Sequence, residues 1–348
     1  MVGSELLVRL APARPGARIY ILTRDPDRVP ARFRGPQFSI LSGDLRLPRL
    51  GLNDWQLAAV RRSVTEIVHC AADTRIEAPL DQARETNCTG TANLLALAAD
   101  CERLIKFLHL STVYVAGRLS GPIPEAVITH STRFTNTYQQ SMYEAEAIVA
   151  GSAGSVPVAI ARLSTIVGDS HGVVRKQNCV HQLLRLFPRS HLQQAPYEPK
   201  GLVDLIASDW AADALAWLFL NRFQSGDVWH ISDGPTAGFS VEEMLAETHR
   251  LFAHHPKAQR WLPIDLPRMV PLSDYEEFVE RTESSGSRLA AELLRAVNSY
   301  LPQMGIPQTF ENHRTRALLA PSRLEPPPVR QLYADVVRWC LDTDWGRM

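Results

Sequence analysis

Short apolar runs alternate with segments of helical periodicity over the first half of the chain. The runs are rich in β-branched and aromatic residues, as buried strands are. The segments between them place apolar residues at helical spacing. We expect strands at 17–23, 38–43, 66–72, 105–110 and 157–162, and helices at 4–10, 55–62, 87–99 and around Tyr138. This alternation predicts a parallel sheet with helices on both faces, a doubly wound α/β fold.

The pattern is weaker in the second half of the chain. We expect helices at 180–186, 209–215 and 329–341, and a strand at 227–231. Ser240 followed by Glu243 predicts a capping box, in which each side chain bonds the other residue's backbone N–H at the start of a helix. The sheet domain is expected to cover residues 1–235, with a smaller and mainly helical region over 236–348.

Charge and composition argue against several classes of function. Lys plus Arg and Asp plus Glu each number 37, so no net field attracts nucleic acid or an anionic membrane. No apolar run reaches the ~18 residues of a membrane helix. The five cysteines are scattered and include no C-x-x-C pair, which favours reduced thiols in a cytoplasm. The histidines lack metal-ligand spacing, so no metal site is expected.

The helical segment around Tyr138 carries the main candidate for chemistry. Residues four apart share a helix face, so Tyr138 and residue 142 point the same way. A free phenol titrates near pH ~10, too high for ready proton exchange at neutral pH, and a nearby ammonium would lower that pKa. Here the position holds Met142, which has no charge. A lone tyrosine on a helix is more often a half-buried structural residue than a catalytic one, so the surrounding motifs must decide the role of Tyr138.

The order of motifs around Tyr138 resembles the extended short-chain dehydrogenase/reductases, specifically their thioester reductase and fatty acyl reductase (male sterility) branch. No single motif is specific to that branch, whereas the ordered set, from residue 2 to about residue 345, is. The matching segments are 22–26, 43–45, 50–52, 69–72, 86–87, 90–91, 109–117, 136–146, 162–164, 167–169, 309–312 and 325–328.

The resemblance implies a Rossmann-like NAD(P)-binding domain followed by a substrate-binding region. It implies reduction of an acyl thioester, on coenzyme A or a carrier protein, to an aldehyde or alcohol. Tyr138 would supply the proton, and Thr112, preferred over Ser111, would bond the developing oxyanion. The family lysine that tunes the tyrosine and binds the ribose is replaced by Met142, although Lys106 or Lys176 could approach in space.

The resemblance also assigns residues to the cofactor. Arg24 follows the second expected strand. At this position an acidic residue bonds the adenosine ribose of NAD, whereas an arginine accommodates the 2′-phosphate of NADP. It favours NADP over NAD, with the adjacent Asp25 leaving NAD open. Leu163 stands where the family usually has proline, near the nicotinamide. The expected cofactor contacts are Gly3, Arg24, Asp44, Leu45, Ala71, Ala72, Asn87, Arg162 and Ser164.

Only the end of the family's phosphate-binding turn is recognisable. Gly3 matches the third glycine of that turn, and the strand and two glycines before it are missing from the sequence. Because that strand is central, its loss would leave two neighbouring strands with unpaired edges. We expect the natural chain to begin roughly ten or more residues upstream, the length of one strand and turn. Degeneration of the site is the alternative.

Three hypotheses follow. The first is an acyl-thioester reductase whose catalysis is impaired. The second is a non-catalytic relative that binds a ligand or partner through the inherited cleft. The third is another extended short-chain enzyme, such as an epimerase or hydroxysteroid dehydrogenase, which segments 50–52 and 310–312 argue against.

Overall fold

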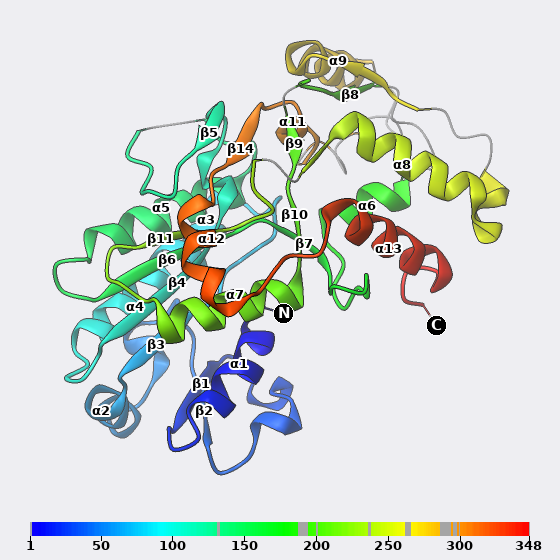
Figure 1. Ribbon diagram of the computed structural model, residues 1–348. Helices are drawn as coiled ribbons and strands as arrows, with labels where there is room; N and C mark the ends of the chain where they lie inside the picture. Colours follow the sequence, from blue (N-terminus) through cyan, green and yellow to red (C-terminus); the bar gives the residue numbers. More distant parts are fainter. Residues whose placement is uncertain are drawn as a thin grey trace.

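The computed structural model describes residues 2–130, 133–186, 194–199, 201–235, 238–261, 266–285, 294, 298 and 300–347. A parallel sheet forms its centre (Figure 1). The strand order is β11 (Val228–Ile231), β6 (Val158–Leu163), β4 (Lys106–Thr112) and β3 (Glu66–His69), and every neighbouring pair is parallel. Parallel strands require crossover connections, which the helices between them supply.

Helices cover both faces of this sheet, as strand β4 illustrates. Its Phe107 packs in a cluster with residues of α4 (Gly90–Ala99) and α5 (Thr137–Gly151). The next residue of the strand, Leu108, packs in a second cluster, with residues of α7 (Ser208–Asn221). Successive side chains of a strand point to opposite faces, so these two clusters lie on opposite sides of the sheet. The predicted doubly wound α/β fold is confirmed.

The sheet is interrupted near the N-terminus. Strand β1 (Ile19–Thr23) pairs in parallel with β2 (Phe38–Ser42), and β3 pairs with β4. Within the described part of the chain nothing pairs with the second edge of β1 or of β3, and Figure 1 shows β1 and β2 below β3. Every residue of β1 is partly exposed, as expected of a strand bonded on one side.

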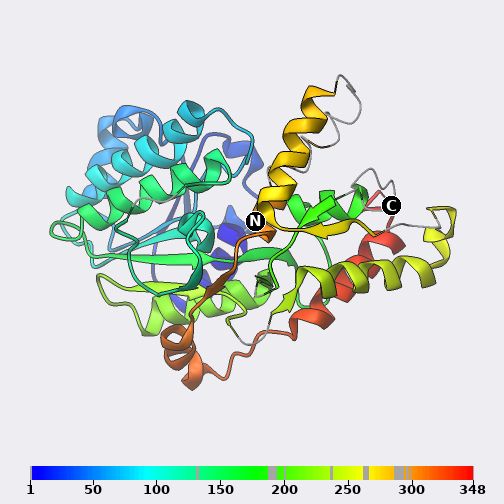
Figure 2. The ribbon, with the colours of Figure 1, turned by 90° about the horizontal axis from the view of Figure 1, so that it is seen from above.

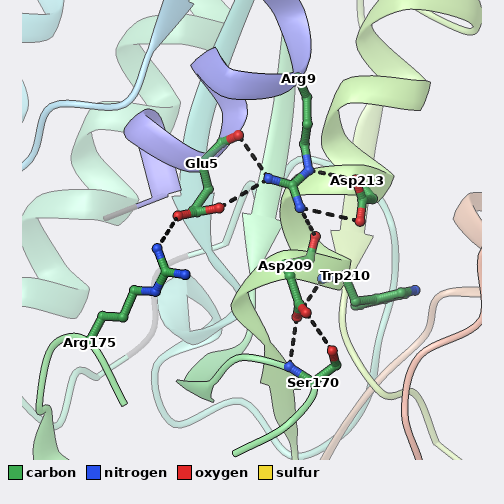
Figure 3. Close-up of polar contacts among 7 residues, drawn as sticks. All are labelled: Glu5, Arg9, Ser170, Arg175, Asp209, Trp210 and Asp213. Atoms are coloured by element: carbon green, nitrogen blue, oxygen red, sulfur yellow. Dashed lines mark hydrogen bonds and ion pairs between the residues drawn. The ribbon is translucent and has the colours of Figure 1, made fainter. Parts of the chain in front are cut away.

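A network of charged side chains fixes helix α1 (Val2–Ala13) to α7 (Figure 3). The Arg9 guanidinium donates to the Asp213 carboxylate at 2.5 Å and to the Asp209 carbonyl at 3.1 Å. Glu5 accepts from Arg9 at 3.1 Å and from Arg175, in the loop before α6, at 3.2 Å. The helix is thereby attached both to the sheet's covering layer and to that loop.

The C-terminal segments return to the sheet domain. Strand β14 (Gln308–Phe310) pairs with β5 (Gly121–Ile123). Helix α13 (Val329–Asp342) packs in the cluster that contains Leu108 and residues of α7. Helix α8 (Val241–His254) lies beside α13, as Figure 2 shows in yellow-green and red. The expected boundary at residue 235 stays a prediction, because backbone pairing and packing join the two regions.

Most predicted elements are present, and several short ones were not predicted. The capping box is confirmed: Ser240 accepts from the Glu243 N–H, and Glu243 accepts in return. The expected helix at 87–99 begins seven residues earlier, at Leu80, and includes a π-helical turn at Glu85–Thr89. The remaining bounds are α2 Asp54–Ser63, α3 Leu80–Arg84, β7 Thr165–Gly168, α6 Cys179–Leu186, β8 Gln194–Pro196, β9 Leu202–Val203, β10 Leu205–Ala207, β12 Phe239–Ser240, β13 Arg268–Val270, α9 Leu272–Ser284, α11 Leu301–Met304 and α12 His313–Leu319.

Candidate functional site

Thr112 and Tyr138 meet at the carboxyl end of the sheet. Thr112 is the last residue of β4, and Tyr138 lies in the first turn of α5. Asn136 caps that helix by accepting from the Gln139 N–H at 3.0 Å. The Thr112 hydroxyl lies close enough to the Tyr138 phenol to lower the pKa of that phenol. The two groups expected to act on one substrate carbonyl are thus brought together.

The surroundings of Tyr138 oppose ionisation. Burial raises the pKa of its phenol to about 12; the nearby Thr112 hydroxyl lowers that pKa and the nearby Cys179 thiol raises it. Among the described side chains no cation contributes to this shift. At pH 7 about one phenol in 10⁵ would be ionised, so the Tyr138 phenol stays protonated at neutral pH.

Met142 lies in an apolar cluster. It is 2% exposed and packs with Ile123, Ile128 and Phe310, and the Tyr138 ring packs against the same cluster. An unpaired ammonium would be costly there, because no described acid lies in that cluster. A methionine fills such a site without a polar group to satisfy.

Neither lysine that could have replaced the missing cation does so. Lys106 lies at the opposite end of β4, where its ammonium donates to the Phe219 carbonyl at 2.7 Å. Lys176 is exposed on the loop before α6, and it does not affect the pKa of Tyr138. Neither lysine thus stands in for the missing cation, and the impairment of the site stays a prediction.

Ser111 points away from Thr112. Successive strand residues face opposite sides, and the Ser111 hydroxyl is buried with no partner among the described atoms. Thr112, whose hydroxyl lies near the Tyr138 phenol, stays the preferred residue of the two.

Arg162 is placed inside the protein. Its guanidinium is fully buried and pairs with Glu146 of α5 at 2.7 and 2.9 Å, with His230 Nε2 at 3.2 Å. Ser164 is also buried and donates to the Asp204 carbonyl at 2.7 Å. Both expected cofactor contacts have protein partners that explain their positions, and contact with a cofactor stays a prediction.

Asn87 clamps two elements beside Tyr138. Its amide donates to the Asp73 carbonyl at 3.0 Å and to the Ser141 hydroxyl at 2.9 Å, and its oxygen accepts from the Asp73 N–H at 2.7 Å. These bonds hold the segment after β3 against α5. Both amide N–H groups thus have protein partners, and contact of Asn87 with a cofactor stays a prediction.

Five charged residues cluster beyond the ends of β1, β2 and β3. Asp44 accepts the forked guanidinium of Arg46, and Asp73 accepts that of Arg75 in the same local arrangement. These arginines lower the pKa of their carboxyls, and the exposed Arg24 lowers both further. Arg24 therefore lies near both carboxylates, at the edge where the adenosine end of a dinucleotide is expected.

The first turn of α1 closely approaches the end of β3. A Cβ built on Gly3 would lie 2.6 Å from the Cys70 sulfur, so glycine allows this approach without displacing Cys70. Ala71 is exposed and Ala72 partly exposed, so small side chains border open space here. Leu45 lies against helix α4, where its carbonyl accepts from the Asn93 amide at 2.8 Å. These features fit a bound dinucleotide at its diphosphate end, whereas the environment of Tyr138 lacks the cation expected at the nicotinamide end.

Sequence reasoning missed two neighbours of Tyr138. Cys179, the first residue of α6, has a thiol close enough to affect the phenol, and burial raises its own pKa to about 11. Gln139 is buried and bonds Gln303 of the C-terminal region. No sequence pattern points to either, because both partners come from distant segments.

The described residues include neither a cluster of metal ligands nor a membrane-spanning helix. No group of three His, Cys, Asp or Glu side chains is arranged to hold a metal ion there. Within the same ranges no helix combines the length and apolarity needed to cross a membrane. All five cysteines are unpaired.

Comparisons with known proteins agree with the resemblance. Residues 1–215 match the model of the male sterility protein family. A hybrid PKS-NRPS synthetase, gkaA, of Penicillium citrinum is 28% identical over 202 residues, which is 56% of this chain and 5% of that protein. The fatty acyl-CoA reductase wat of Drosophila melanogaster is 28% identical over 193 residues, 47% of this chain and 37% of that protein. The chain thus spans well under half the length of these relatives.

Solved structures show the same fold. The terminal R domain of the myxalamid PKS-NRPS pathway has a TM-score of 0.77 at 20% identity, covering 99% of this chain and 89% of that one. An archaeal thiolation-reductase di-domain has a TM-score of 0.69 at 14% identity, covering 99% and 74%. The family match covers more than half of the sequence and begins at its first residue. The chain belongs to the male sterility protein family.

Proposed function

We propose that this chain binds NADP(H) and an acyl thioester in the manner of its relatives but transfers hydride poorly. The observation that carries the proposal is the Thr112–Tyr138 pair, whose hydroxyl groups lie close together at the end of the sheet, near a buried Met142. The pair supplies an oxyanion donor and a proton. The methionine removes the cation that would help the tyrosine.

The chain's residues would act on the substrate carbonyl as follows. Thr112 would donate its hydroxyl hydrogen bond to the developing oxyanion, and Tyr138 would hold the proton at its phenol oxygen for that oxyanion. A bound nicotinamide cofactor supplies the hydride. With its pKa raised to about 12, Tyr138 is a weaker acid than a free tyrosine, so proton transfer is less favourable.

Acyl thioesters on coenzyme A or a carrier protein are the proposed substrates. Relatives named as fatty acyl-CoA reductase and as thiolation-reductase support this class. The chain covers only part of the length of these relatives. The identities of the acyl group and of its carrier are therefore proposed from the relatives' names alone.

NADPH binding and turnover test the proposal together. We would measure NADPH binding by calorimetry, and NADPH oxidation with a medium-chain acyl-CoA, for the wild type, Met142→Lys and the matched Met142→Leu. We expect all three to bind NADPH and only Met142→Lys to gain turnover, by tenfold or more. Failure of all three to bind would reject the cofactor proposal, and fast wild-type turnover would reject the impairment.

A second candidate is a binding protein without catalysis. It is favoured by the apolar packing of Met142, which leaves no place for a cation beside Tyr138. It predicts that Met142→Lys also fails to turn over while a non-hydrolysable acyl-CoA analogue still binds. Thermal melting of Met142→Lys, beside Met142→Leu, would show whether the new ammonium simply unfolds the cluster.

The NADP preference rests on Arg24. Its exposed guanidinium near Asp44 and Asp73 suits the 2′-phosphate of NADP. We expect Arg24→Ala to weaken NADPH binding at least tenfold and NADH binding little, with Arg62→Ala on α2 as the control. An equal loss for both nucleotides would contradict the assignment.

A further inference from the structure

Three glutamine side chains form a continuous hydrogen-bonded chain. Gln308 donates to the carbonyls of Gly117 at 2.8 Å and Leu119 at 2.5 Å. Gln303 donates to Gln308 Oε1 at 2.7 Å. Gln139 in turn donates to Gln303 Oε1 at 2.7 Å.

The ends of this chain determine its direction. The Thr135 backbone N–H, which can only donate, bonds Gln139 Oε1 at 3.0 Å. The carbonyls of Gly117 and Leu119 can only accept. Each amide must therefore present its oxygen toward Thr135 and its nitrogen toward Gly117. Reversing any one amide would place two acceptors or two donors together, so the orientation is unique.

The glutamine chain joins the segments that carry Thr112 and Tyr138. Gly117 and Leu119 follow Thr112 after a short 3-10 turn, Val113–Ala116. At the other end, Gln139 directly follows Tyr138 in the first turn of α5.

The middle of the chain comes from the C-terminal region. Gln303 lies in α11 and Gln308 begins β14. Gln139 and Gln308 are 3% and 4% exposed. Water therefore cannot readily replace a broken bond, and a missing link leaves a buried polar atom without a partner.

We propose that Gln303 and Gln308 are positioning residues that hold Thr112 and Tyr138 beside each other. This rests on the proposed function of that pair. The two groups lie on separate elements, and each is anchored to the same pair of glutamines within a few residues. The C-terminal region therefore has a part in the chemistry that does not require it to touch the substrate.

The test reads the Tyr138 phenol directly. In protein labelled with ¹³C at tyrosine Cζ, Tyr138→Phe assigns the resonance, and Thr112→Val reports the shift caused by losing the neighbouring hydroxyl. Gln303→Met keeps the length of the side chain and removes its hydrogen bonds. We expect it to move the Tyr138 resonance in the same direction as Thr112→Val. Gln331→Met, on the exposed face of α13, should leave it unchanged.

A second variant protects the test from a folding defect. Gln303→Glu can accept from Gln139 but, when ionised, cannot donate to Gln308. We expect a displaced Tyr138 resonance at pH 8 that returns toward the wild-type position as acid protonates the new carboxyl. A Tyr138 resonance identical to wild type in folded Gln303→Met or Gln303→Glu would overturn the proposal. No cofactor or turnover enters this readout, so failure of the reductase proposal would appear separately, as absent NADPH binding.

Discussion

Strands β1 and β4 both belong to the parallel α/β region, yet they lie in different environments. β1 reads Ile-Tyr-Ile-Leu-Thr and has no fully buried residue. β4 reads Lys-Phe-Leu-His-Leu-Ser-Thr, is less apolar, and buries every residue except Lys106. β4 pairs on both edges, with β3 and β6, whereas β1 pairs only with β2. Burial here follows the number of strand partners more closely than the apolar content of the strand.

The comparison extends to ionisable groups. The four-stranded sheet contains three buried histidines, His69, His109 and His230, and the buried ion pair of Arg162 with Glu146. The β1–β2 pair has none of these. The four-stranded part should therefore dominate the response of the protein to acid and to mutation.

The largest expected effect is acid destabilisation of the four-stranded part. Burial lowers the pKa of His69, His109 and His230 to about 3, 4 and 3, with smaller effects of His109 on His69 and of Arg162 on His230. Below pH ~6.5 the unfolded chain binds protons that the folded chain does not, so stability falls as pH decreases toward those values. At pH 4.5 this costs roughly 2–3 kcal/mol per histidine.

The variant His109→Leu isolates this effect. Both His109 ring nitrogens lack a partner among the described atoms, so leucine should cost little at pH 7. Asp233, whose pKa burial raises to about 7, has the opposite sign, because its folded form retains a proton. The contribution of Asp233 to the pH dependence of stability cancels in the difference between wild type and variant. Urea unfolding at pH 7 and 4.5 should show a smaller acid loss for His109→Leu, and an unchanged loss would contradict the prediction.

Breaking the buried ion pair should have the next largest effect. Arg162→Met leaves the Glu146 carboxylate buried without its partner, which costs about 3–5 kcal/mol in comparable cases. The free energy of unfolding in urea measures the loss. The double variant Arg162→Met with Glu146→Leu should recover much of it. A double variant as unstable as the single one would show that packing, and not the orphaned charge, sets the cost.

A pair of leucines compares the two strands directly. Leu108 in β4 is fully buried, whereas Leu22 in β1 is partly exposed. We expect Leu108→Ala to cost about 2–5 kcal/mol and Leu22→Ala about half of that or less. Equal losses in the same urea assay would mean that β1 is as well packed as β4, and the contrast between them would fail.

The smallest expected effect is at the surface of the N-terminal half. Trp55 on α2 is 78% exposed, so Trp55→Ser should change the free energy of unfolding by less than about 0.5 kcal/mol. A larger loss would indicate that the side chain is covered in solution. Analytical ultracentrifugation of wild type and variant would then show whether a second molecule covers it.

Local signals made most of the fold predictable. Apolar alternation located β1, β2, β3, β4, β6 and β11, and helical spacing located the helices between them. Short strands such as β5, β8 and β14 escaped prediction, because a strand of three residues has too few positions to show a period. Such strands form through a distant partner and not through their own sequence.

The candidate site was predictable in its members more than in its connections. Thr112 and Tyr138 were expected together and lie close to each other. Arg162 and Asn87 were expected at a cofactor, which stays a prediction, and in the structure both bond protein partners. A sequence gives the chemistry of a side chain, whereas the packing around it decides which of its atoms remain available.

The sequence by itself determined the alternation of strands and helices, the family, and the methionine at position 142. These depend on residue identity and on spacing along the chain. Only the tertiary structure decided that Met142 is enclosed by apolar side chains, that no described cation approaches Tyr138, and that Gln303 and Gln308 join its helix to the segment after Thr112. Each of these depends on side chains far apart in sequence, whose meeting is set by the packing of the whole fold.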